Sequence, residues 1–226
     1  MKITKFGHSC ILVELAGDSS KTVLFDPGVF SEVPVDSLTR LDGICITHEH
    51  ADHCDVETLL KLRQKFPDVR ITTTTEVATQ LNAHGLISLD VASNGIRFFI
   101  SPHEVVAPFG GPIPEQIGVH FAELFTHPGD SHGFDETMPV LALPVTAPWG
   151  TTVRALELAL QLKPKVVVPI HDWFWQENAR QWSYDRLGEV FRQHGIVFIP
   201  LGMGQGCELD EASLLAPDPG RNLVIS

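Results

Sequence analysis

The stretch Ile46-Thr47-His48-Glu49-His50-Ala51-Asp52-His53 places three histidines and two carboxylates directly after the apolar run LDGICIT. On a helix, His48 and His50 would lie on opposite sides, whereas a helical zinc motif needs ligands four positions apart. The spacing instead predicts an extended segment or a loop, on which these two histidines point the same way and Asp52 and His53 follow in a turn. Such a segment offers ligands to two neighbouring metal ions.

Further histidine and aspartate residues follow later strands of the predicted fold. His103 comes after the apolar run IRFFISP, Asp130 lies in THPGDSHG after VHFAELF, and His171 comes at the end of KVVVPI. Their separation is far too long for a zinc-finger hairpin, but it suits ligands gathered from several strand ends at one rim of a sheet. A carboxylate such as Asp130 can bridge two cations while histidines complete each ligand set.

Around these residues the sequence alternates short strands with helices. The predicted strands are 2–7, 9–15, 21–27, 41–47, 69–75, 138–145, 164–170 and 196–201, and the predicted helices are 55–67, 76–85, 151–162 and 184–195. The first three strands are expected to be antiparallel, and residues 85–131 resemble a further antiparallel set with long loops. No Gly/Ser-rich linker, low-complexity tract or repeat divides the chain, so residues 1–226 are predicted to form one domain.

The composition is that of an ordinary packed globular protein, with 43% hydrophobic and 19% charged residues. The formal net charge of −12 comes from 16 Lys+Arg and 28 Asp+Glu, and an acidic surface repels nucleic acid. The first residues lack the apolar segment of a signal peptide, and no apolar run approaches membrane-spanning length, which predicts a cytoplasmic protein without a membrane partner. The four cysteines form no C-x-x-C pair and are expected to be reduced, mostly buried thiols.

The order of these motifs resembles the metallo-β-lactamase superfamily of metal-dependent hydrolases. The pattern is T-H-x-H-x-D-H after a buried strand, preceded by LFDPG and followed by a lone histidine, a Gly-Asp pair and a strand-terminal histidine. The segments KITKFGHSCILVE and LELALQLKPKVVVPIH are most similar to its small stand-alone branch, related to the L-ascorbate 6-phosphate lactonases. The resemblance extends from about residue 1 to residue 200. It implies an α/β fold, the αββα sandwich, in which two mixed sheets are each faced by helices.

The resemblance also implies a ligand set for two divalent metal ions. His48, His50 and His103 would hold one ion, Asp52, His53 and His171 would hold the other, and Asp130 would bridge them. Asp26 in LFDPG matches a buried aspartate that orients the histidine loop, and His8 in GHSC matches a position near the site. From the residues alone, Asp26 and His8 keep the alternative of ordinary turn residues.

Two such ions, about 3.5–4 Å apart, can hold a water as hydroxide near neutral pH, and this bridging hydroxide would be the nucleophile. Asp52, with one oxygen free, would orient or deprotonate the water, and His132 is a candidate proton donor to an oxyanion or leaving group. Imidazole and carboxylate ligands without cysteine favour zinc, although manganese, iron or nickel fit the same atoms. The expected substrate is a small ester, lactone, phosphoester or amide.

The remaining histidines have plainer expectations. His84 and His194 each precede a glycine at a predicted helix end, where the ring caps the helix or sits in solvent. His120 lies mid-strand and is expected to be a packed or surface residue. His127 is either a partner of a ligand or a packing residue.

Several aromatic residues either line a substrate pocket or belong to the core. Those that follow His171 are Trp173, Phe174, Trp175 and Trp182. Trp149 stands in VTAPWGTT, where relatives carry a Gly-rich turn, and is expected to alter the pocket. The Gly/Pro-rich loop at 107–118 is either an active-site rim or an ordinary surface loop.

Two other functions remain open on the sequence. RNA-processing nucleases occur in the same superfamily, but they usually carry an additional domain and basic surfaces, whereas this chain is acidic. A non-catalytic metal-binding scaffold is the other, but a structural site is coordinatively closed and would not need seven ligand residues. The sequence therefore predicts a hydrolase whose partner is a small molecule, and a homo-oligomer is compatible with it.

Overall fold

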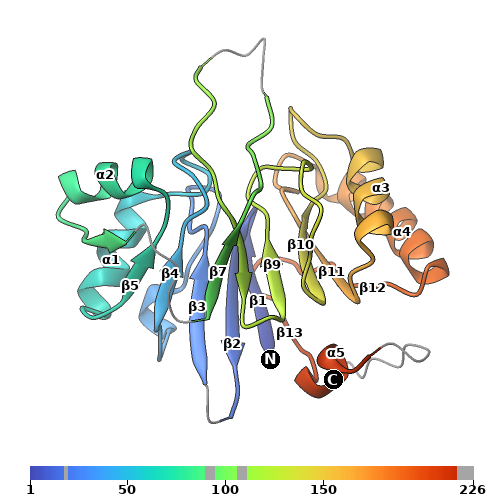
Figure 1. Cartoon of the computed structure of the whole chain (residues 1–226), viewed down its shortest axis with the longest axis horizontal. Helices are drawn as coiled ribbons and strands as arrows, with labels where there is room; N and C mark the ends of the chain where they lie inside the picture. Colours follow the sequence, from blue (N-terminus) through green and yellow to red (C-terminus); the bar gives the residue numbers. More distant parts are fainter. Residues whose placement is uncertain (18–19, 90–94, 106–110, 218–226) are drawn as a thin grey trace.

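The computed structural model describes residues 1–17, 20–89, 95–105 and 111–217. In this part of the chain two β-sheets face each other, and helices cover the outer face of each sheet (Figure 1). The predicted αββα sandwich is confirmed. Part of the turn expected at 16–21 and part of the loop expected at 107–118 lie outside the described residues.

The first sheet has seven strands among the described residues, in the order β13-β1-β2-β3-β4-β5-β6. Their bounds are β13 (Gly206–Glu208), β1 (Lys2–Gly7), β2 (Cys10–Leu15), β3 (Lys21–Phe25), β4 (Gly43–Cys45), β5 (Arg70–Thr72) and β6 (Ser88–Leu89). The pairs from β13 to β3 are antiparallel, as expected for the first three strands, and the pairs from β3 to β6 are parallel. The carboxyl ends of β1, β3 and β4 therefore meet at one edge of the sheet.

The second sheet has six strands among the described residues, in the order β12-β11-β10-β9-β8-β7. Their bounds are β12 (Val197–Phe198), β11 (Val166–Ile170), β10 (Val140–Pro144), β9 (Phe125–His127), β8 (Gly118–Phe121) and β7 (Ile96–Phe99). β8 is antiparallel to both of its neighbours, β7 and β9, and the pairs from β9 to β12 are parallel. The carboxyl ends of β7, β9 and β11 consequently share an edge.

All four predicted helices are present, and side-chain caps explain where three of them begin. Asp55, Thr74 and Thr151 accept backbone N–H groups in the first turns of α1, α2 and α3. The helices are α1 (Val56–Lys65), α2 (Thr75–Ala83), α3 (Thr152–Leu162) and α4 (Glu177–Gln193), with a short α5 (Glu211–Leu215) and a 3-10 turn η1 (Val35–Ser37).

Four elements differ most from the sequence prediction. α4 starts at Glu177 rather than at 184. The sequence pattern missed its first two turns because they bury no side chain, and the apolar pattern begins only at Tyr184. β12 covers two residues of the predicted 196–201, because Pro200 has no N–H to donate to a ladder. β13 and α5 were not predicted, since a short and largely exposed strand leaves no periodic pattern.

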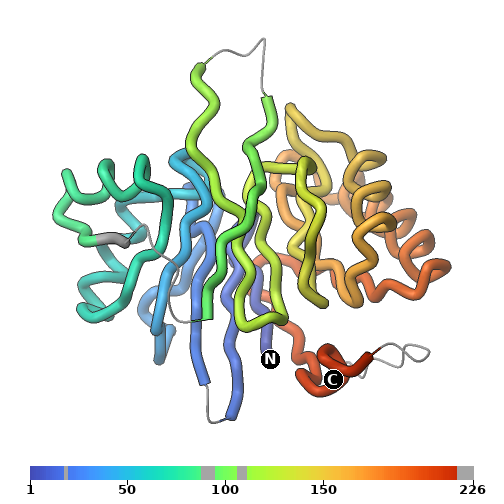
Figure 2. The backbone as a smooth tube through the Cα atoms, in the orientation of Figure 1, coloured from blue at the N-terminus to red at the C-terminus, as the bar shows by residue number. Residues whose placement is uncertain are grey.

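Alternating side chains along the strands fill three apolar layers. On β2, Val13 belongs to the layer between the sheets and Leu12 to the layer under α1 and α2. On β11, Val168 faces the layer between the sheets and Val167 faces α3 and α4. The two sheets overlap in the view of Figure 2, where the blue and green parts of the tube meet at the centre. The strands are thus held on both faces, which makes their ends rigid.

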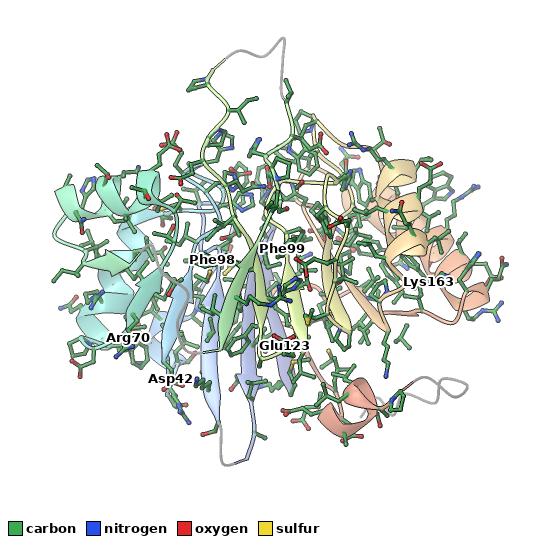
Figure 3. The ribbon with its side chains drawn as sticks, viewed as in Figure 1. Asp42, Arg70, Phe98, Phe99, Glu123 and Lys163 are labelled. Carbon is green, nitrogen blue, oxygen red and sulfur yellow. The ribbon has the colours of Figure 1, made fainter. Side chains whose placement is uncertain are left out.

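The shared carboxyl ends of β1, β3 and β4 and those of β7, β9 and β11 lie at one end of the sandwich. The opposite end carries the residues that begin β4 and β5, and Asp42 and Arg70 mark it in the lower part of Figure 3. The four cysteines are free and three of them are buried, as predicted.

Candidate metal centre

The segment that follows β4 is not helical, as its histidine spacing predicts. The backbone N–H of Ile46 still donates to the Thr72 carbonyl oxygen of β5 at 3.0 Å, so the sheet fixes the start of the loop. The loop closes in a turn in which the N–H of His53 donates to the His50 carbonyl oxygen at 2.9 Å. The ligand-bearing residues are therefore held between a rigid strand end and a hydrogen-bonded turn.

Four of the seven predicted ligands form a first group, whose ligand atoms all lie within 4.8 Å of one another. This group is His48, His50, His103 and Asp130. His50 Nδ1 lies 3.2 Å from the Nε2 atoms of both His48 and His103. Asp130 Oδ2 lies 3.7 Å from His103 Nε2 and 4.0 Å from His48 Nε2. Three imidazole nitrogens and a carboxylate oxygen thus converge on one point.

A second group contains the other three predicted ligands, Asp52, His53 and His171, together with His8. The Nε2 atoms of His53 and His171 are 3.0 Å apart, and Asp52 Oδ2 lies 3.9 Å from His53 Nε2. His8 Nε2 lies 3.1 Å from Asp52 Oδ2. The sequence placed His8 near the site, and the structure places its ring nitrogen beside the second group.

Asp130 lies between the two groups and turns one oxygen toward each. Oδ2 faces the first group, while Oδ1 lies 2.6 Å from His171 Nε2 and 2.8 Å from His53 Nε2. Oδ1 is nevertheless buried and accepts no hydrogen bond of good geometry from the described residues. A carboxylate with this placement is suited to bridge two cations.

The charges around His53 favour a cation. Burial opposes its protonation, but the carboxylates of Asp130 and Asp26 outweigh burial and raise the pKa of His53 well above its ordinary value. Burial likewise opposes ionisation of Asp130, but His171 and His53 hold the pKa of its carboxyl well below the ordinary value. Buried carboxylates facing imidazole nitrogens are the donor set that zinc, manganese, iron and nickel accept. The residues present therefore fit divalent metal ions.

Asp26 lies directly under the second group and is fully buried. Its Oδ1 accepts the backbone N–H of Thr47 at 2.8 Å, and its Oδ2 accepts the Thr47 hydroxyl at 2.7 Å. Oδ2 also lies 2.6 Å from His53 Nδ1. A carboxylate in this position requires the proton of His53 on Nδ1, which leaves Nε2 free to bind a metal.

Three residues around the centre have positive φ although they are not glycine: His8 at 37°, Asp26 at 45° and His171 at 64°. Each follows the last residue of a strand, β1, β3 or β11. Such backbone conformations cost on the order of 1–3 kcal/mol each and persist where the surrounding structure fixes them. The backbone N–H of His171 donates to the His8 carbonyl oxygen at 3.3 Å, which joins two of these residues across the two sheets.

The family described as beta-lactamase superfamily domain matches residues 2–171, which carry all of the candidate ligands. The chain belongs to the beta-lactamase superfamily. Similar proteins from two organisms are named UPF0173 metal-dependent hydrolase. It is therefore a metal-dependent hydrolase of this superfamily.

Relatives cover most of the length of this hydrolase. Protein Rv0786c of Mycobacterium tuberculosis is 35% identical over 202 residues, which are 84% of this chain and 92% of that protein. A UPF0173 metal-dependent hydrolase of Caldivirga maquilingensis is 25% identical over 212 residues, 85% of this chain and 92% of that protein. Among solved structures, the metallo hydrolase Igni18 of the archaeon Ignicoccus hospitalis has a TM-score of 0.67 at 20% identity, covering 91% of this chain and 96% of that one. At 20% identity, the similarity to Igni18 shows a shared fold and nothing further.

In this beta-lactamase superfamily hydrolase, His8 is buried beside Asp52, and its imidazole ring is uncharged near neutral pH. Burial, and next the charge of His171, lower the pKa of His8 from its ordinary 6.5 to about 4. Burial opposes ionisation of Asp52, but the hydrogen bond from His8 and the charge of His53 bring the pKa of its carboxyl below the ordinary value. A neutral His8 therefore donates the proton on Nε2 to the Asp52 carboxylate.

Two residues that the sequence did not single out support the ligands from behind. Gln116 Oε1 accepts the backbone N–H of Asp130 at 2.9 Å, and its amide nitrogen donates to the Ser101 carbonyl oxygen at 2.8 Å. The carbonyl oxygen of Glu104 accepts His103 Nδ1 at 2.7 Å and so turns Nε2 toward the centre. Neither role leaves a signal in the sequence, because both depend on the path of the loop that connects β7 and β8.

His127 supports the site through backbone groups. Its Nε2 donates to the Ser9 carbonyl oxygen at 2.9 Å, and its Nδ1 accepts the N–H of Gly129 at 3.3 Å and lies 3.7 Å from Asp26 Oδ2. The ring is fully buried and stacks on Phe25 with centroids 5.9 Å apart. Both sequence alternatives therefore describe it in part, since it packs in the core and also contacts the aspartate under His53.

Trp149 contacts the bridging aspartate directly. Its indole Nε1 donates to Asp130 Oδ2 at 3.0 Å, and its ring lies 5.5 Å from the ring of His171. His132 packs against Trp149 with ring centroids 5.1 Å apart, and its Nε2 donates to the Pro144 carbonyl oxygen at 2.8 Å. This hydrogen bond leaves Nδ1 as the remaining ring nitrogen of His132 for chemistry, and that atom is buried.

The aromatic residues after His171 divide between surface and core. Trp173 and Phe174 are exposed, whereas Trp175 is half-buried and packs against the apolar layer under α3 and α4. Trp182 is 59% exposed and lies under the guanidinium of Arg186, 4.0 Å from the ring centroid. Only the first two of these residues stand beside the metal centre.

The three other histidines lie where the sequence predicts. His84 and His194 are the C-cap residues of α2 and α4. His120 is buried in β8, where it stacks on Phe99 with centroids 4.2 Å apart. Within the described residues, no helix combines the length and the apolar character that crossing a membrane requires.

Proposed function

We propose that this metal-dependent hydrolase is dinuclear and that it cleaves a small ester, lactone, phosphoester or amide. The observation that carries the proposal is the division of the donor atoms into two adjacent groups with Asp130 between them. Zinc is the favoured metal, and manganese, iron and nickel are alternatives. When bound, two such ions lower the pKa of a water held between them and polarise the substrate oxygen under attack.

The protein holds the metals through the two donor groups. One ion would be held by His48, His50 and His103 and the other by Asp52, His53 and His171, and Asp130 would offer one oxygen to each. Some of the ligands are turned toward the centre by a group behind them, such as Asp26 behind His53 and the Glu104 carbonyl oxygen behind His103. This support keeps the ligand atoms in place before the substrate arrives.

Asp52 accepts the proton of the attacking water. Its side chain is 21% exposed, whereas that of Asp130 is 4% exposed, so Asp52 is the carboxylate open to the substrate side. His8 donates to Oδ2 of Asp52 and keeps this carboxylate ionised and oriented. Ionised and within reach of solvent, Asp52 meets two requirements of a general base, an unprotonated carboxylate and access to the reacting water.

His132 is the second catalytic candidate from the sequence, as a proton donor to the leaving group. Its Nε2 is engaged with the Pro144 carbonyl oxygen, so the proton would come from Nδ1 on a protonated ring. The variant His132→Gln tests this role. A fall in kcat that is largest at low pH, where the wild-type ring is protonated, and that shrinks as the pH rises supports it, whereas an unchanged kcat assigns the ring to packing.

We further propose that the substrate is a small molecule and that the enzyme works in the reducing cytoplasm, which agrees with four free cysteines and an acidic chain. RNA binding that weakens with added salt would contradict the first point. Detection of the protein in an oxidising compartment would contradict the second.

The test combines metal analysis with turnover. The protein is stripped with a chelator, reconstituted separately with zinc, manganese, iron or nickel, and assayed on chromogenic esters, lactones, phosphodiesters and amides. We expect two metals per chain and turnover that returns with one of them. Asp130→Ala should lose one or both metals and the turnover, whereas Asp42→Ala, at the other end of the sheet, should keep both. Two metals and full activity in Asp130→Ala would refute the site.

A further inference from the structure

A pocket of about 430 Å³ lies beside the metal centre. Its walls come from the end of β1, the residues after His171, the first half of α4 and the loop 200–205. His8 and Trp173 belong to this pocket, and His8 also donates to Asp52. The volume falls within the range of about 300–1,000 Å³ that is typical of small-molecule sites. The pocket therefore adjoins the reaction centre through a shared side chain.

The charged groups of the pocket already neutralise one another. Lys5 Nζ lies 2.7 Å from Asp172 Oδ1, and Arg180 lies 2.7 Å from Glu177 Oε2 and 3.4 Å from Asp172 Oδ2. The hydroxyl of Tyr184 also donates to Asp172. Two cations thus face two carboxylates. A phosphate or carboxylate of a ligand would lose its water here without gaining an unpaired cation, so the pocket disfavours anionic groups.

The same pocket has an apolar wall that is open to solvent. Trp173 is 46% exposed and Met203 is 49% exposed, and buried Leu201 lies next to them. Trp173 stacks on Phe30 with ring centroids 4.0 Å apart, and Phe174 packs edge-on against both rings. The wall is therefore supported by other aromatic rings. Exposed apolar surface of this kind beside a reaction centre is typical of a binding surface.

We infer that this pocket binds the uncharged, apolar part of the substrate, such as an alkyl or acyl chain, while the reacting group lies at the metals. The inference rests on the proposed function and narrows its substrate class to neutral esters, lactones and amides that carry such a chain. Gln181 and Gln205 also line the pocket and can hydrogen-bond to a polar, uncharged end of the chain. Phosphorylated substrates are disfavoured by the paired charges described above.

The experiment measures binding of three hydroxamates to the metal-loaded protein by calorimetry. Acetohydroxamate chelates the metals alone, hexanohydroxamate adds a neutral chain, and the monohydroxamate of adipic acid adds a chain of similar length that ends in a carboxylate. Because four methylene or methyl groups leave water, we expect hexanohydroxamate to bind about tenfold to a hundredfold more tightly than acetohydroxamate. The adipic compound should gain less than about threefold.

Variants assign this gain to the pocket. Trp173→Ala should remove most of it without weakening acetohydroxamate, and Met203→Gln should reduce it with less change to the fold. Trp182→Ala is the matched control, because this tryptophan is also exposed, at 59% against 46% for Trp173, but lies outside the pocket against Arg186. Glu177→Gln leaves Asp172 as the one described carboxylate facing Lys5 and Arg180, and this excess of positive charge should tighten the adipic compound severalfold.

The outcomes separate the inference from the proposed function. Equal affinity for all three hydroxamates, or a gain for hexanohydroxamate that Trp173→Ala and Met203→Gln leave unchanged, overturns the inference alone. A metal-loaded protein that neither binds acetohydroxamate nor cleaves any ester overturns the proposed function, and the inference falls with it. A carboxylate chain that binds as tightly as the neutral one contradicts the argument from paired charges.

Discussion

Replacing Asp26 by asparagine should remove the metal-binding form of His53 while keeping the size of the side chain. The amide would put its nitrogen near the present Oδ2, 2.6 Å from His53 Nδ1, and would donate a hydrogen there. His53 Nδ1 must then accept, so its proton moves to Nε2, the atom that faces Asp130. A protonated Nε2 has no lone pair for a metal.

The opposite orientation of the amide is no better. With its oxygen toward His53, the amide nitrogen would face the backbone N–H of Thr47, now 2.8 Å from Oδ1, and two donors would meet. A buried N–H without a partner costs about 1–3 kcal/mol. Loss of a group that orients a metal-binding histidine typically costs 10- to 100-fold in metal affinity, or about 1.4–2.7 kcal/mol. To bind the metal, His53 Nε2 must be free, which forces the amide into the second orientation with its unpaired N–H. Both estimates therefore predict a similar loss of metal-binding free energy.

The assay is competition between the protein and a chromophoric chelator, which yields the affinity of each metal equivalent. One equivalent should bind about 10- to 100-fold more weakly in Asp26→Asn, and the other should change less. Asp42→Asn is the control, because Asp42 also accepts a backbone N–H, that of Thr22 at 2.8 Å, but lies at the other end of the sheet (Figure 3). If Asp26→Asn bound both equivalents with wild-type affinity, Asp26 would not control the protonation of His53.

Three further changes test other parts of the structure. Trp149→Phe keeps an aromatic ring at this position but removes the indole N–H that is donated to Asp130. Competition titration should then show metal binding weakened by about tenfold. Lys5→Met leaves Asp172 buried with fewer partners and should lower the free energy of unfolding in urea by about 3 kcal/mol, since a broken buried pair costs roughly 3–5 kcal/mol; Lys61→Met, on an exposed pair, should not measurably change it. Chelation of the metals should lower the melting temperature in a calorimetric scan, because the buried ligands lose their cation.

The sequence predicts the local half of the metal centre because its geometry is set by neighbouring residues. Four candidate ligands follow one buried strand. Because side chains two positions apart on an extended segment point to the same side, the spacing predicts that His48 and His50 face one point. The distant ligands His103, Asp130 and His171 were found because parallel strands bring their carboxyl ends to one edge. In each case a rule about strand ends carries the prediction.

Contacts that depend on loop paths lie beyond such rules. Gln116 accepts the backbone N–H of Asp130 at 2.9 Å from fourteen positions earlier in the chain, and no local pattern marks this contact. Trp149 was marked by its departure from a Gly-rich turn, but its hydrogen bond to Asp130 follows from the three-dimensional shape of that turn. The ion pair of Lys5 with Asp172 joins residues far apart in the chain, and a lysine in a strand gives no sign of being 98% buried.

The metal centre also joins the two sheets. The first sheet supplies the loop with His48 to His53, and the second sheet supplies His103, Asp130 and His171 from β7, β9 and β11. Any metal that binds both sets must therefore fix the ends of the two sheets relative to each other. Because three residues at these strand ends have unfavourable φ, we expect a bound metal to help hold their conformation. It follows that metal affinity and the stability of the sandwich should change together when either sheet edge is altered.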